Sequence, residues 1–387
     1  MENWLTEDQR KLKLFCREFA HKEIEATAKE TDDKELFPME NIKKLSEQGL
    51  CGIYVPKELG GMGLDMLSYV TAVEEISKVC ATTGVIFSGQ QSLFCSPILA
   101  HATEEQKKKY IPKLAKGEWI GAFALTEPGA GTDIQSLQTK AVEDGDNFVL
   151  NGSKIFITNA GYANLFITFA ITGTHVNKRG KEVKDCTAFL VERTDPGFSV
   201  TKPEQKMGIK GSSTCVLNFD NCVIPKDRVL GNFGEGFHIA LGTLDGGRIG
   251  ISAQALGIAG GALEETVKYL KAHAPKGRIT ALPQAVQFKL ADLYAEVQSA
   301  KGVVYTAAKK KDQGLNYSVE AATAKLYAAK VATDVATAAV ELCGYDGLSM
   351  DLPIERMMRD AKITEIYEGT SEVQRMVIAG YLDSMQF

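Results

Sequence analysis

Glu368 is the residue whose surroundings in the sequence best suit acid–base chemistry. It stands in the segment "IYEGTSEVQR" (366–375), directly after Tyr367 and directly before Gly369. A half-apolar setting raises the pKa of a carboxyl group toward that of a useful base, and a glycine lets a ligand or backbone come close. The alternative is a carboxylate that only marks the end of a helix, and the local pattern leaves both readings open.

Two further segments, "ALTEPGAGTD" (124–133) and "KIFITNAG" (154–161), place hydroxyl groups beside glycines or an aromatic ring. The first contains Thr126 and Thr132, and the second contains Phe156 and Thr158 at the end of a predicted strand. Backbone N–H groups in a glycine-rich loop can approach a planar or anionic ligand. Either segment alone could be a structural turn, but both together on one β-domain favour a flat aromatic ligand.

The segment "LDGGRIG" (244–250) puts Asp245, two glycines and Arg248 inside a helical pattern. An arginine beside a bare helix surface can reach a phosphate or a carbonyl group. Two small residues also suit a close helix–helix contact, in which Asp245 and Arg248 would form an i,i+3 ion pair. Local evidence favours neither reading.

Composition excludes several classes of protein. The net charge of −5 gives no basic surface for a nucleic acid. Two basic runs, 107–109 and 309–311, lie in helical patterns and are interpreted as solvated faces. The 8 cysteines and 5 histidines show no metal-binding spacing, and no apolar run approaches about 18 residues, so neither a metal nor a membrane span is expected. Without a signal-like start, we expect a cytoplasmic protein.

The pattern of apolar, β-branched and turn residues divides the chain into three parts. Residues 1–120 show helical periodicity, with a capping box predicted at Thr6 and Gln9. Residues 121–230 contain short β-branched and aromatic runs between turn residues, typical of a β-sandwich or barrel. Residues 231–387 return to long helical patterns and predict a helix bundle.

Taken together and in order, "LTEPGAGTD", "IFITN", the glycine-flanked Arg248 and "RDAKITEIYEGTSEVQR" resemble the acyl-CoA dehydrogenase family over almost the whole chain. The resemblance implies a mainly α fold with a central β-domain, in which an N-terminal helical domain and a C-terminal four-helix bundle flank a β-barrel or sandwich. It also implies a homotetramer, with FAD in the cleft between the β-domain and the C-terminal helices.

The resemblance assigns roles to individual residues. It makes Glu368 the catalytic base. The substrate-binding residues would be Thr132, Asp245, Arg248, Tyr367 and Gly369. The cofactor-binding residues would be Phe123, Leu125, Thr126, Thr132, Phe156, Ile157, Thr158, His273, Gln284, Glu341, Gly344, Thr370 and Glu372.

The implied reaction is the α,β-dehydrogenation of a short-chain acyl-CoA to the trans-2-enoyl-CoA. Glu368 takes the α-proton while the β-hydride goes to flavin N5, and the thioester oxygen accepts hydrogen bonds from a ribityl hydroxyl and the Gly369 N–H. Electrons pass to an electron-transferring flavoprotein. Isovaleryl- and long-chain-type relatives carry the base at the position of Gly247. The helix with Gln254 resembles the butyryl-CoA branch, and Gly84 replaces the arginine of glutaryl-CoA relatives.

Two segments depart from the family pattern. His273, Lys276 and Gly277 stand where relatives have R-x-x-F-G, which holds the FAD pyrophosphate across the subunit interface. The run from Glu341 to Tyr345 replaces Q-x-x-G-G, although Gln284 is kept. These changes predict weaker retention of FAD than in typical relatives.

Three other questions stay open in the sequence. The enzyme could run in reverse, as an enoyl-CoA reductase in an anaerobic complex with an electron-transferring flavoprotein. A flavin-depleted binding or assembly subunit is a further reading, against which Glu368 and Thr158 argue. The polar pair Gln90–Gln91, near the expected acyl end, either admits a polar acyl group or is a buried, satisfied amide pair.

Overall fold

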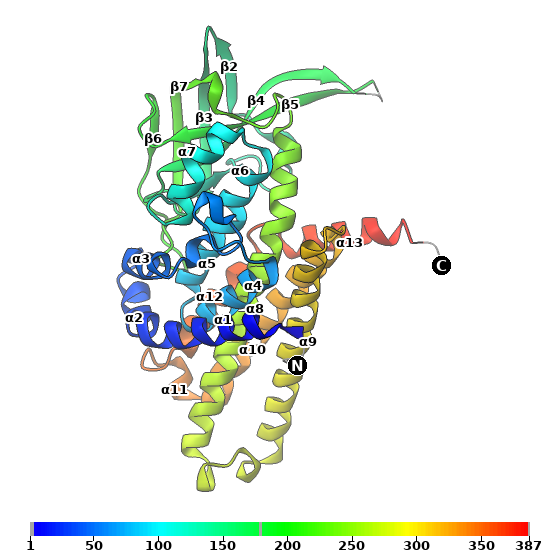
Figure 1. The fold of residues 1–387 in the computed structure, drawn as a ribbon. Coiled ribbons are helices and arrows are strands. Elements are labelled where there is room, and N and C mark those ends of the chain that lie inside the picture. The colour runs from blue at the N-terminus through cyan, green and yellow to red at the C-terminus, as the bar shows by residue number, and fades with distance from the viewer. Residues whose placement is uncertain (1–3, 178–179, 386–387) are drawn as a thin grey trace.

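The structure, a computed structural model, describes residues 4–177 and 180–385. Its elements follow the order helices, sheet, helices. Figure 1 shows the sheet at one end of an elongated molecule and the long helices of the C-terminal part reaching the other end. The predicted fold class, mainly α with a central β-domain, is confirmed; the exact domain boundaries at 120 and 230 stay a prediction.

The region before the sheet consists of short and medium helices. Thr6 caps the first of them as predicted, because its hydroxyl accepts from the Gln9 N–H while Gln9 Oε1 accepts from the Thr6 N–H. A π-helical turn, η5 (Gln90–Cys95), interrupts the later helices. The helices are α1 (Glu7–Phe19), α2 (Glu25–Asp33), α3 (Met39–Glu47), α4 (Met66–Val79), α5 (Ala81–Gly89), α6 (Ser96–His101) and α7 (Glu104–Ala115).

The middle region is one continuous curled sheet with strand order β6-β7-β3-β2-β4-β5-β8, and β1 pairs with β4. β1 and β2 run parallel to β4, and the other pairings are antiparallel. Phenylalanine rings fill one core of the sheet, where Phe148 and Phe189 lie 5.2 Å apart. The strands are β1 (Gly121–Ala124), β2 (Lys140–Asp144), β3 (Asn147–Ile157), β4 (Leu165–Val176), β5 (Glu182–Glu192), β6 (Phe198–Val200), β7 (Cys215–Pro225) and β8 (Val229–Leu230).

Three long helices dominate the C-terminal region, as the periodicity predicts. The longest ends at His273, two residues before Pro275, and the next begins directly after Pro283, because proline does not continue a helix but suits its start. The helices are α8 (Gly236–His273), α9 (Gln284–Asp312), α10 (Ser318–Cys343), α11 (Tyr345–Leu348), α12 (Ile354–Lys362) and α13 (Ser371–Leu382), with the short turn η10 (Ile363–Glu365) between the last two.

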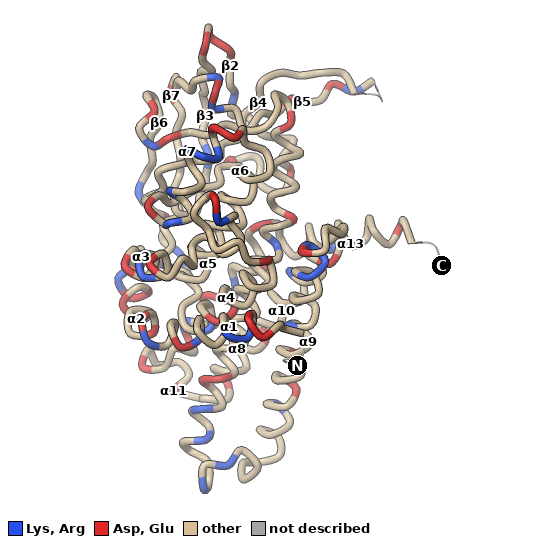
Figure 2. The backbone as a smooth tube through the Cα atoms, in the orientation of Figure 1, with Lys and Arg blue, Asp and Glu red and all other residues tan. Residues whose placement is uncertain are grey.

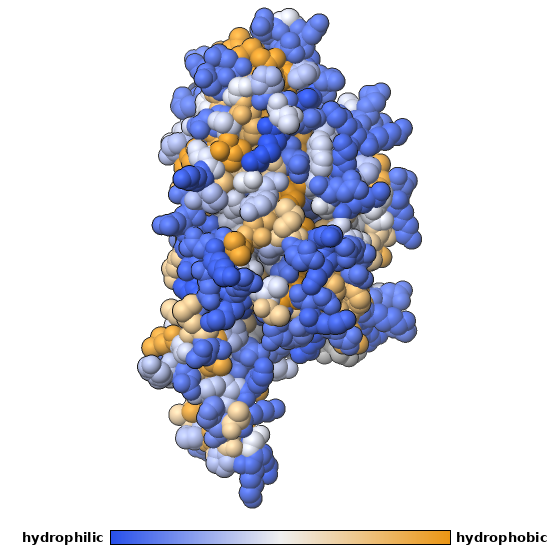
Figure 3. All heavy atoms as spheres, turned by 90° about the vertical axis from the view of Figure 1, so that its left-hand side faces the viewer, coloured by the Kyte–Doolittle hydropathy of each residue, from blue (hydrophilic) through white to orange (hydrophobic). Residues whose placement is uncertain are grey.

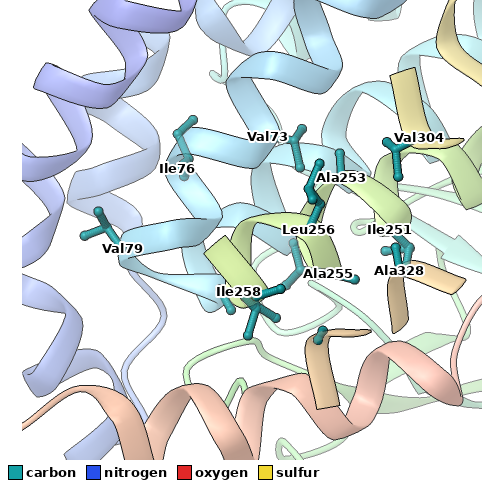
Figure 4. Packing of buried hydrophobic residues seen from close by; sticks show 14 of the residues in the cluster. Val73, Ile76, Val79, Ile251, Ala253, Ala255, Leu256, Ile258, Val304 and Ala328 are labelled. Carbon is teal, nitrogen blue, oxygen red and sulfur yellow. The ribbon is translucent and has the colours of Figure 1, made fainter. Parts of the chain in front are cut away.

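α8 is the central helix of the molecule. Figure 4 shows Ile251, Leu256 and Ile258 of α8 among Val73 of α4 and Val304 of α9, all members of one buried cluster. Glycines on α8 allow this helix to approach α4 closely. A Cβ on Gly257 or Gly261 would collide with backbone atoms of α4. The same helix begins against the sheet, where Gly236 packs on Cys186 of β5. α8 therefore runs without a break from the sheet into the C-terminal helices.

Charges of both signs are spread over most of the chain, but at the tip where α8 ends and α9 begins the charged residues are only Lys and Arg (Figure 2). On the face drawn in Figure 3, hydrophilic residues prevail and hydrophobic residues form smaller groups. Within the described residues, no helix is long and apolar enough to cross a membrane.

Candidate active site

Glu368 lies in a break between two helices, as the glycine and hydroxyl residues predict. η10 ends at Glu365, and α13 begins at Ser371 with Thr370 as its N-cap, whose hydroxyl accepts from the Val373 N–H at 3.4 Å. Glu368 adopts φ 51° and Gly369 adopts φ 92°. Left-handed φ is unfavourable for a side chain such as glutamate and persists only where the surroundings enforce it.

Two buried side chains enforce this turn. The ammonium group of Lys325, on α10, donates to the Gly369 carbonyl at 2.7 Å. The amide of Gln374, on α13, donates to the same carbonyl at 2.8 Å. Both side chains have an exposed fraction of 0%. The peptide that follows Gly369 is thereby anchored to α10 and α13.

The carboxylate of Glu368 points into the protein. The residue is half-buried as a whole, but its Oε2 atom is buried and has no hydrogen-bond partner among the described residues. Burial raises the pKa of Glu368 to about 7, although the positive charges of Lys325 and Arg248 act to lower it. A carboxylate with a pKa near neutrality and a free oxygen can accept a proton from a bound molecule at physiological pH.

Gly247 on α8 faces this carboxylate. A Cβ built on Gly247 would collide with Glu368 Oε2 and would lie 3.0 Å from Leu93 Cδ2, which η5 contributes. The bare helix surface thus leaves room for the carboxylate where any side chain would fill the space.

Asp245 and Arg248 form the ion pair that the i,i+3 spacing suggests, with 2.5 Å between Oδ1 and Nη1. Arg248 is nevertheless not a surface residue: its exposed fraction is 5%, and its Nε atom is buried without a partner. An unsatisfied donor on a buried guanidinium is unusual and marks a position where a ligand acceptor can bind. The predicted ion pair is present, although Arg248 is buried rather than on the surface, and contact of Arg248 with a ligand stays a prediction.

Tyr367 joins the site to the helix core. Its hydroxyl donates to Gln254 Oε1 on α8, and the Gln254 amide donates to the Ala81 carbonyl at 3.1 Å. Burial and the neighbouring Glu368 raise the pKa of the Tyr367 hydroxyl well above its usual value. Tyr367 therefore remains a neutral donor that ties the chain directly before Glu368 to α8.

The two threonine-containing segments of the sheet lie together, as we expected for a shared ligand. The Ile155 N–H donates to the Thr126 carbonyl at 2.9 Å. Behind them the buried ammonium of Lys154 bonds to Glu127 Oε1 at 2.7 Å and to the Leu125 carbonyl at 3.1 Å. Burial alone would raise the pKa of Glu127, but Lys154 and backbone donors outweigh it and hold that pKa below its usual value.

One side of this region is open to a ligand. Phe156 adopts φ 56° and exposes 63% of its surface, which is unusual for a large apolar side chain. A Cβ on Gly129 or Gly131 would meet nothing within 4 Å, and Thr132 is exposed in the same loop. By contrast, the side chains of Leu125 and Ile157 are buried, so these residues can offer a ligand only their backbone. An exposed ring beside open backbone suits a flat ring system.

The other predicted cofactor residues lie away from the open loop around Gly129. Phe123 packs against Phe169 at 5.0 Å, Thr158 is half-buried at the end of the β3 region, and Glu372 is exposed in an ion pair with Arg375. Four predicted residues, all exposed, lie at the far ends of the long helices: His273, Gln284, Glu341 and Gly344. At about 1.5 Å per residue, α8 extends about 39 Å from Gly247 to His273. Within one chain these residues do not meet the Glu368 site.

Hydrogen bonds to backbone groups favour the structural reading of the amide pair. Gln90 bonds to backbone groups of Leu114, Trp119 and Gly121, and Gln91 Oε1 accepts from the Ile53 N–H at 2.7 Å. The two side chains are buried, and backbone groups satisfy the Gln90 amide, whereas Gln91 Nε2 is buried without a partner in the described part of the chain. The described residues contain no cluster of metal-binding side chains.

Several residues of the site escaped sequence reasoning. Lys325, Gln374 and the Glu127–Lys154 pair all support predicted residues, yet they stand far from them in the sequence or in unremarkable patterns. Lys325 lies in an alanine-rich helical run, where a single lysine is usually solvated. The solvated reading of 309–311 is wrong for Lys311, which burial desolvates so that its pKa falls to about 8. The signal that could have revealed these buried lysines is a charged residue within the apolar face of a helix.

The comparisons with known proteins define the class. Family models described as the acyl-CoA dehydrogenase N-terminal, middle and C-terminal domains match residues 6–118, 122–222 and 234–382. The chain is an enzyme of this oxidoreductase class, and it belongs to the acyl-CoA dehydrogenase family.

Three relatives illustrate the similarity. A short-chain specific acyl-CoA dehydrogenase of Clostridium acetobutylicum is 54% identical, covering 97% of this chain and 98% of its own. The butyryl-CoA dehydrogenase structure from Megasphaera elsdenii is 44% identical, with a TM-score of 0.92 and 98% of each chain covered. A third match comes from a structural study of the electron transferring flavoprotein of Acidaminococcus fermentans and its flavin-based electron bifurcation. The matched chain is 48% identical, with a TM-score of 0.92 and 98% of each chain covered.

Proposed function

We propose that the chain dehydrogenates a short-chain acyl-CoA between its α and β carbons, with Glu368 as the catalytic base. The observation that carries this proposal is the buried, unpartnered Oε2 of Glu368 facing the bare surface of Gly247. A carboxylate that only ended a helix would be solvated or bonded to protein donors. The short-chain preference rests on the similarity to the short-chain and butyryl-CoA enzymes.

The base acts on a very weak carbon acid. Removal of the proton beside a thioester leaves charge on the thioester oxygen, and hydrogen-bond donors must stabilise it. In the described structure, the backbone N–H groups of Glu368 and Gly369 donate to no protein acceptor, so this turn offers donors next to the base. Lys325 and Gln374 hold the Gly369 carbonyl and so fix the direction of these donors. Glu368 Oε2 receives the proton.

FAD is the cofactor of this family of enzymes. When bound, it supplies the oxidising ring system that takes up the two electrons and the second hydrogen of the substrate. The exposed Phe156, the hydroxyls of Thr126 and Thr158 and the open loop around Gly129 fit a flat ring with polar edges. We assign Thr132 to the same loop contact, and Thr370 and Glu372 to the nucleotide part.

We further propose that Asp245 and Arg248 contact the CoA part of the substrate, since Arg248 carries a free buried donor next to Glu368. Tyr367 and Gly369 complete the substrate site around the base.

A homotetramer explains the residues at the far helix ends. His273, Gln284, Glu341 and Gly344 lie too far from Glu368 to share a cofactor within one chain, so their predicted contact to FAD requires a second copy. Large apolar side chains on α9 and α13 are exposed and could be covered in such an assembly: Phe288, Tyr294, Met376 and Leu382. Light scattering of the purified protein tests this state, and a monomer would contradict it.

The reverse reaction, reduction of an enoyl-CoA with electrons from an electron-transferring flavoprotein, is a second candidate. It is favoured by the 48% identity to the chain from the flavoprotein study of electron bifurcation. Base and donors serve both directions, because Glu368 would then return the proton to the α carbon. Rapid reduction of crotonyl-CoA only with the reduced flavoprotein would select this direction.

The decisive experiment is a panel of short, branched, cyclic and unsaturated acyl-CoAs with flavin absorbance as the readout. Butyryl-CoA should bleach the yellow holoenzyme. Glu368→Gln should abolish bleaching and leave acyl-CoA binding intact, because the amide fills the same space without accepting the proton. Retained bleaching in this variant would remove Glu368 from the mechanism, and a protein that is colourless as purified and after added FAD would support the binding-subunit reading instead.

A further inference from the structure

Lys325 is a fully buried lysine next to the proposed base. It lies on α10 with an exposed fraction of 0%, and its only hydrogen bond in the described structure goes to the Gly369 carbonyl at 2.7 Å. A buried ammonium group is costly unless charges or hydrogen bonds compensate for it. Because no carboxylate forms an ion pair with Lys325 in the described part of the chain, its positive charge remains available to the site.

The turn at Glu368 depends on the group that Lys325 holds. Glu368 and Gly369 are two consecutive residues with left-handed φ, 51° and 92°. The next carbonyl along the chain, that of Gly369, accepts hydrogen bonds from Lys325 and Gln374. Such a strained turn persists only where neighbouring contacts over-determine it. Lys325 contributes one of the two contacts, and it is the charged one.

The charged and titratable groups around Glu368 come from four elements. Lys325 faces it from α10, Arg248 from α8, Tyr69 from α4, and Tyr367 precedes it in the chain. The guanidinium of Arg248 is paired with Asp245 at 2.5 Å, which offsets much of its charge. Tyr69 donates to Ser88, and Tyr367 donates to Gln254, so both remain neutral.

More distant carboxylates act on Lys325 rather than on Glu368. Apart from Glu368 itself, Glu365 and Glu372 on either side of the break raise the pKa of Lys325, but neither bonds to it. Burial has the larger effect and lowers the pKa of Lys325 to about 8, so the amine is still mostly protonated at neutral pH. Of all groups around Glu368, Lys325 is therefore the cation without a counter-ion.

We infer that Lys325 is a positioning residue for Glu368, which holds the left-handed turn through the Gly369 carbonyl and supplies the positive charge that keeps the carboxylate available as a base. This inference rests on the proposed role of Glu368. It separates two contributions of one side chain, a hydrogen bond and a charge, and each can be removed on its own.

Three substitutions separate these contributions in the holoenzyme. Lys325→Met removes both the charge and the hydrogen bond, Lys325→Gln removes the charge and keeps an amide donor, and Lys325→Arg keeps the charge. Lys330→Gln is the matched control, because Lys330 lies on the same helix with 62% of its side chain exposed and pairs only with Asp334 on the surface.

The readout is the pH profile of kcat and of KM for butyryl-CoA. Loss of the charge should move the acid limb of kcat toward higher pH by about one unit in both Lys325→Met and Lys325→Gln. At about pH 7, kcat should fall about tenfold in Lys325→Met, with KM changed less than about twofold, since substrate contacts are kept. Lys325→Arg should retain the original acid limb, and Lys330→Gln should leave the whole profile unchanged.

A merely structural lysine gives a different result. In that case Lys325→Met would lower activity by one factor at every pH, and Lys325→Gln would show the original acid limb, which would overturn the inference. If Lys325→Met does not fold, the contrast between Lys325→Gln and Lys325→Arg still decides. Glu368→Gln, measured alongside, identifies which proposal fails: an inactive Glu368→Gln with an unmoved limb in Lys325→Gln rejects only the role of Lys325, whereas an active Glu368→Gln rejects both.

Discussion

Gly247 and the Oε2 atom of Glu368 lie so close together that a Cβ atom on Gly247 would collide with the carboxylate. The resemblance implied that some relatives carry the base at the position of Gly247. In this chain the two positions face each other across one small space, although Gly247 lies on α8 and Glu368 in the break before α13, far apart in the sequence. The space beside Gly247 is therefore taken by the Glu368 carboxylate.

Gly247→Ala should displace the Glu368 carboxylate, because the added methyl group would occupy the position of Oε2. We expect kcat for butyryl-CoA to fall about tenfold or more, since small misplacements of a catalytic group are costly. Gly242→Ala is the matched control on α8: its Cβ would meet nothing within 4 Å, and it should keep full activity with about 1 kcal/mol more stability. Equal activity of both variants would contradict the contact.

The raised pKa of Glu368 makes the stability of the protein depend on pH. Its pKa of about 7 in the folded state exceeds the ordinary glutamate pKa of 4.5, so the native state binds the proton more tightly than the unfolded chain. This contribution is fully present below about pH 4.5 and is lost as the pH rises to about 7. Relative to Glu368→Gln, the native chain should lose about 3 kcal/mol across this window. Denaturant titrations of both proteins at several pH values measure the difference, and parallel curves would refute a raised pKa.

Breaking the Glu127–Lys154 pair should destabilise the sheet region. Lys154→Met leaves the carboxylate of Glu127 buried with only backbone donors, which costs about 3–5 kcal/mol. The matched control is Lys226→Met, which removes a partner of Glu143 in an exposed pair of the same region and should cost less than about 1 kcal/mol. The free energy of unfolding checks both, and a similar small loss in each would show that the buried pair does not anchor the loop.

FAD should be held less tightly than in typical relatives, as the altered segments at His273 and Glu341 predict. In the structure the ring of His273 packs on that of Tyr269 at 4.3 Å and its Nδ1 bonds to the Tyr269 carbonyl at 2.9 Å, while the Tyr269 hydroxyl donates to Asp346. His273→Arg should increase the flavin that the protein retains after extensive dilution and gel filtration. Complete retention by the unaltered chain would contradict the prediction.

Much of the fold was predictable because its signals are local. The capping box at Thr6, the helix ends at Pro275 and Pro283 and the alternation of short strands each depend on a few adjacent residues. The break around Glu368 was predictable for the same reason, since Gly369 and Thr370 interrupt one helical pattern and start another. Register within the sheet and the order of its strands depend on pairing between distant segments, which no local pattern specifies.

The sequence by itself determined that a carboxylate stands in a glycine-containing break, that two threonine-containing segments belong to one β-domain, and that helical regions precede and follow this domain in the chain. Only the tertiary structure decided which groups surround the carboxylate. Lys325 stands 44 positions before Gly369, and Gly247 lies on another helix altogether. The pKa and direction of a buried carboxylate depend on the charges and atoms that pack around it, and those meet only when the helices assemble.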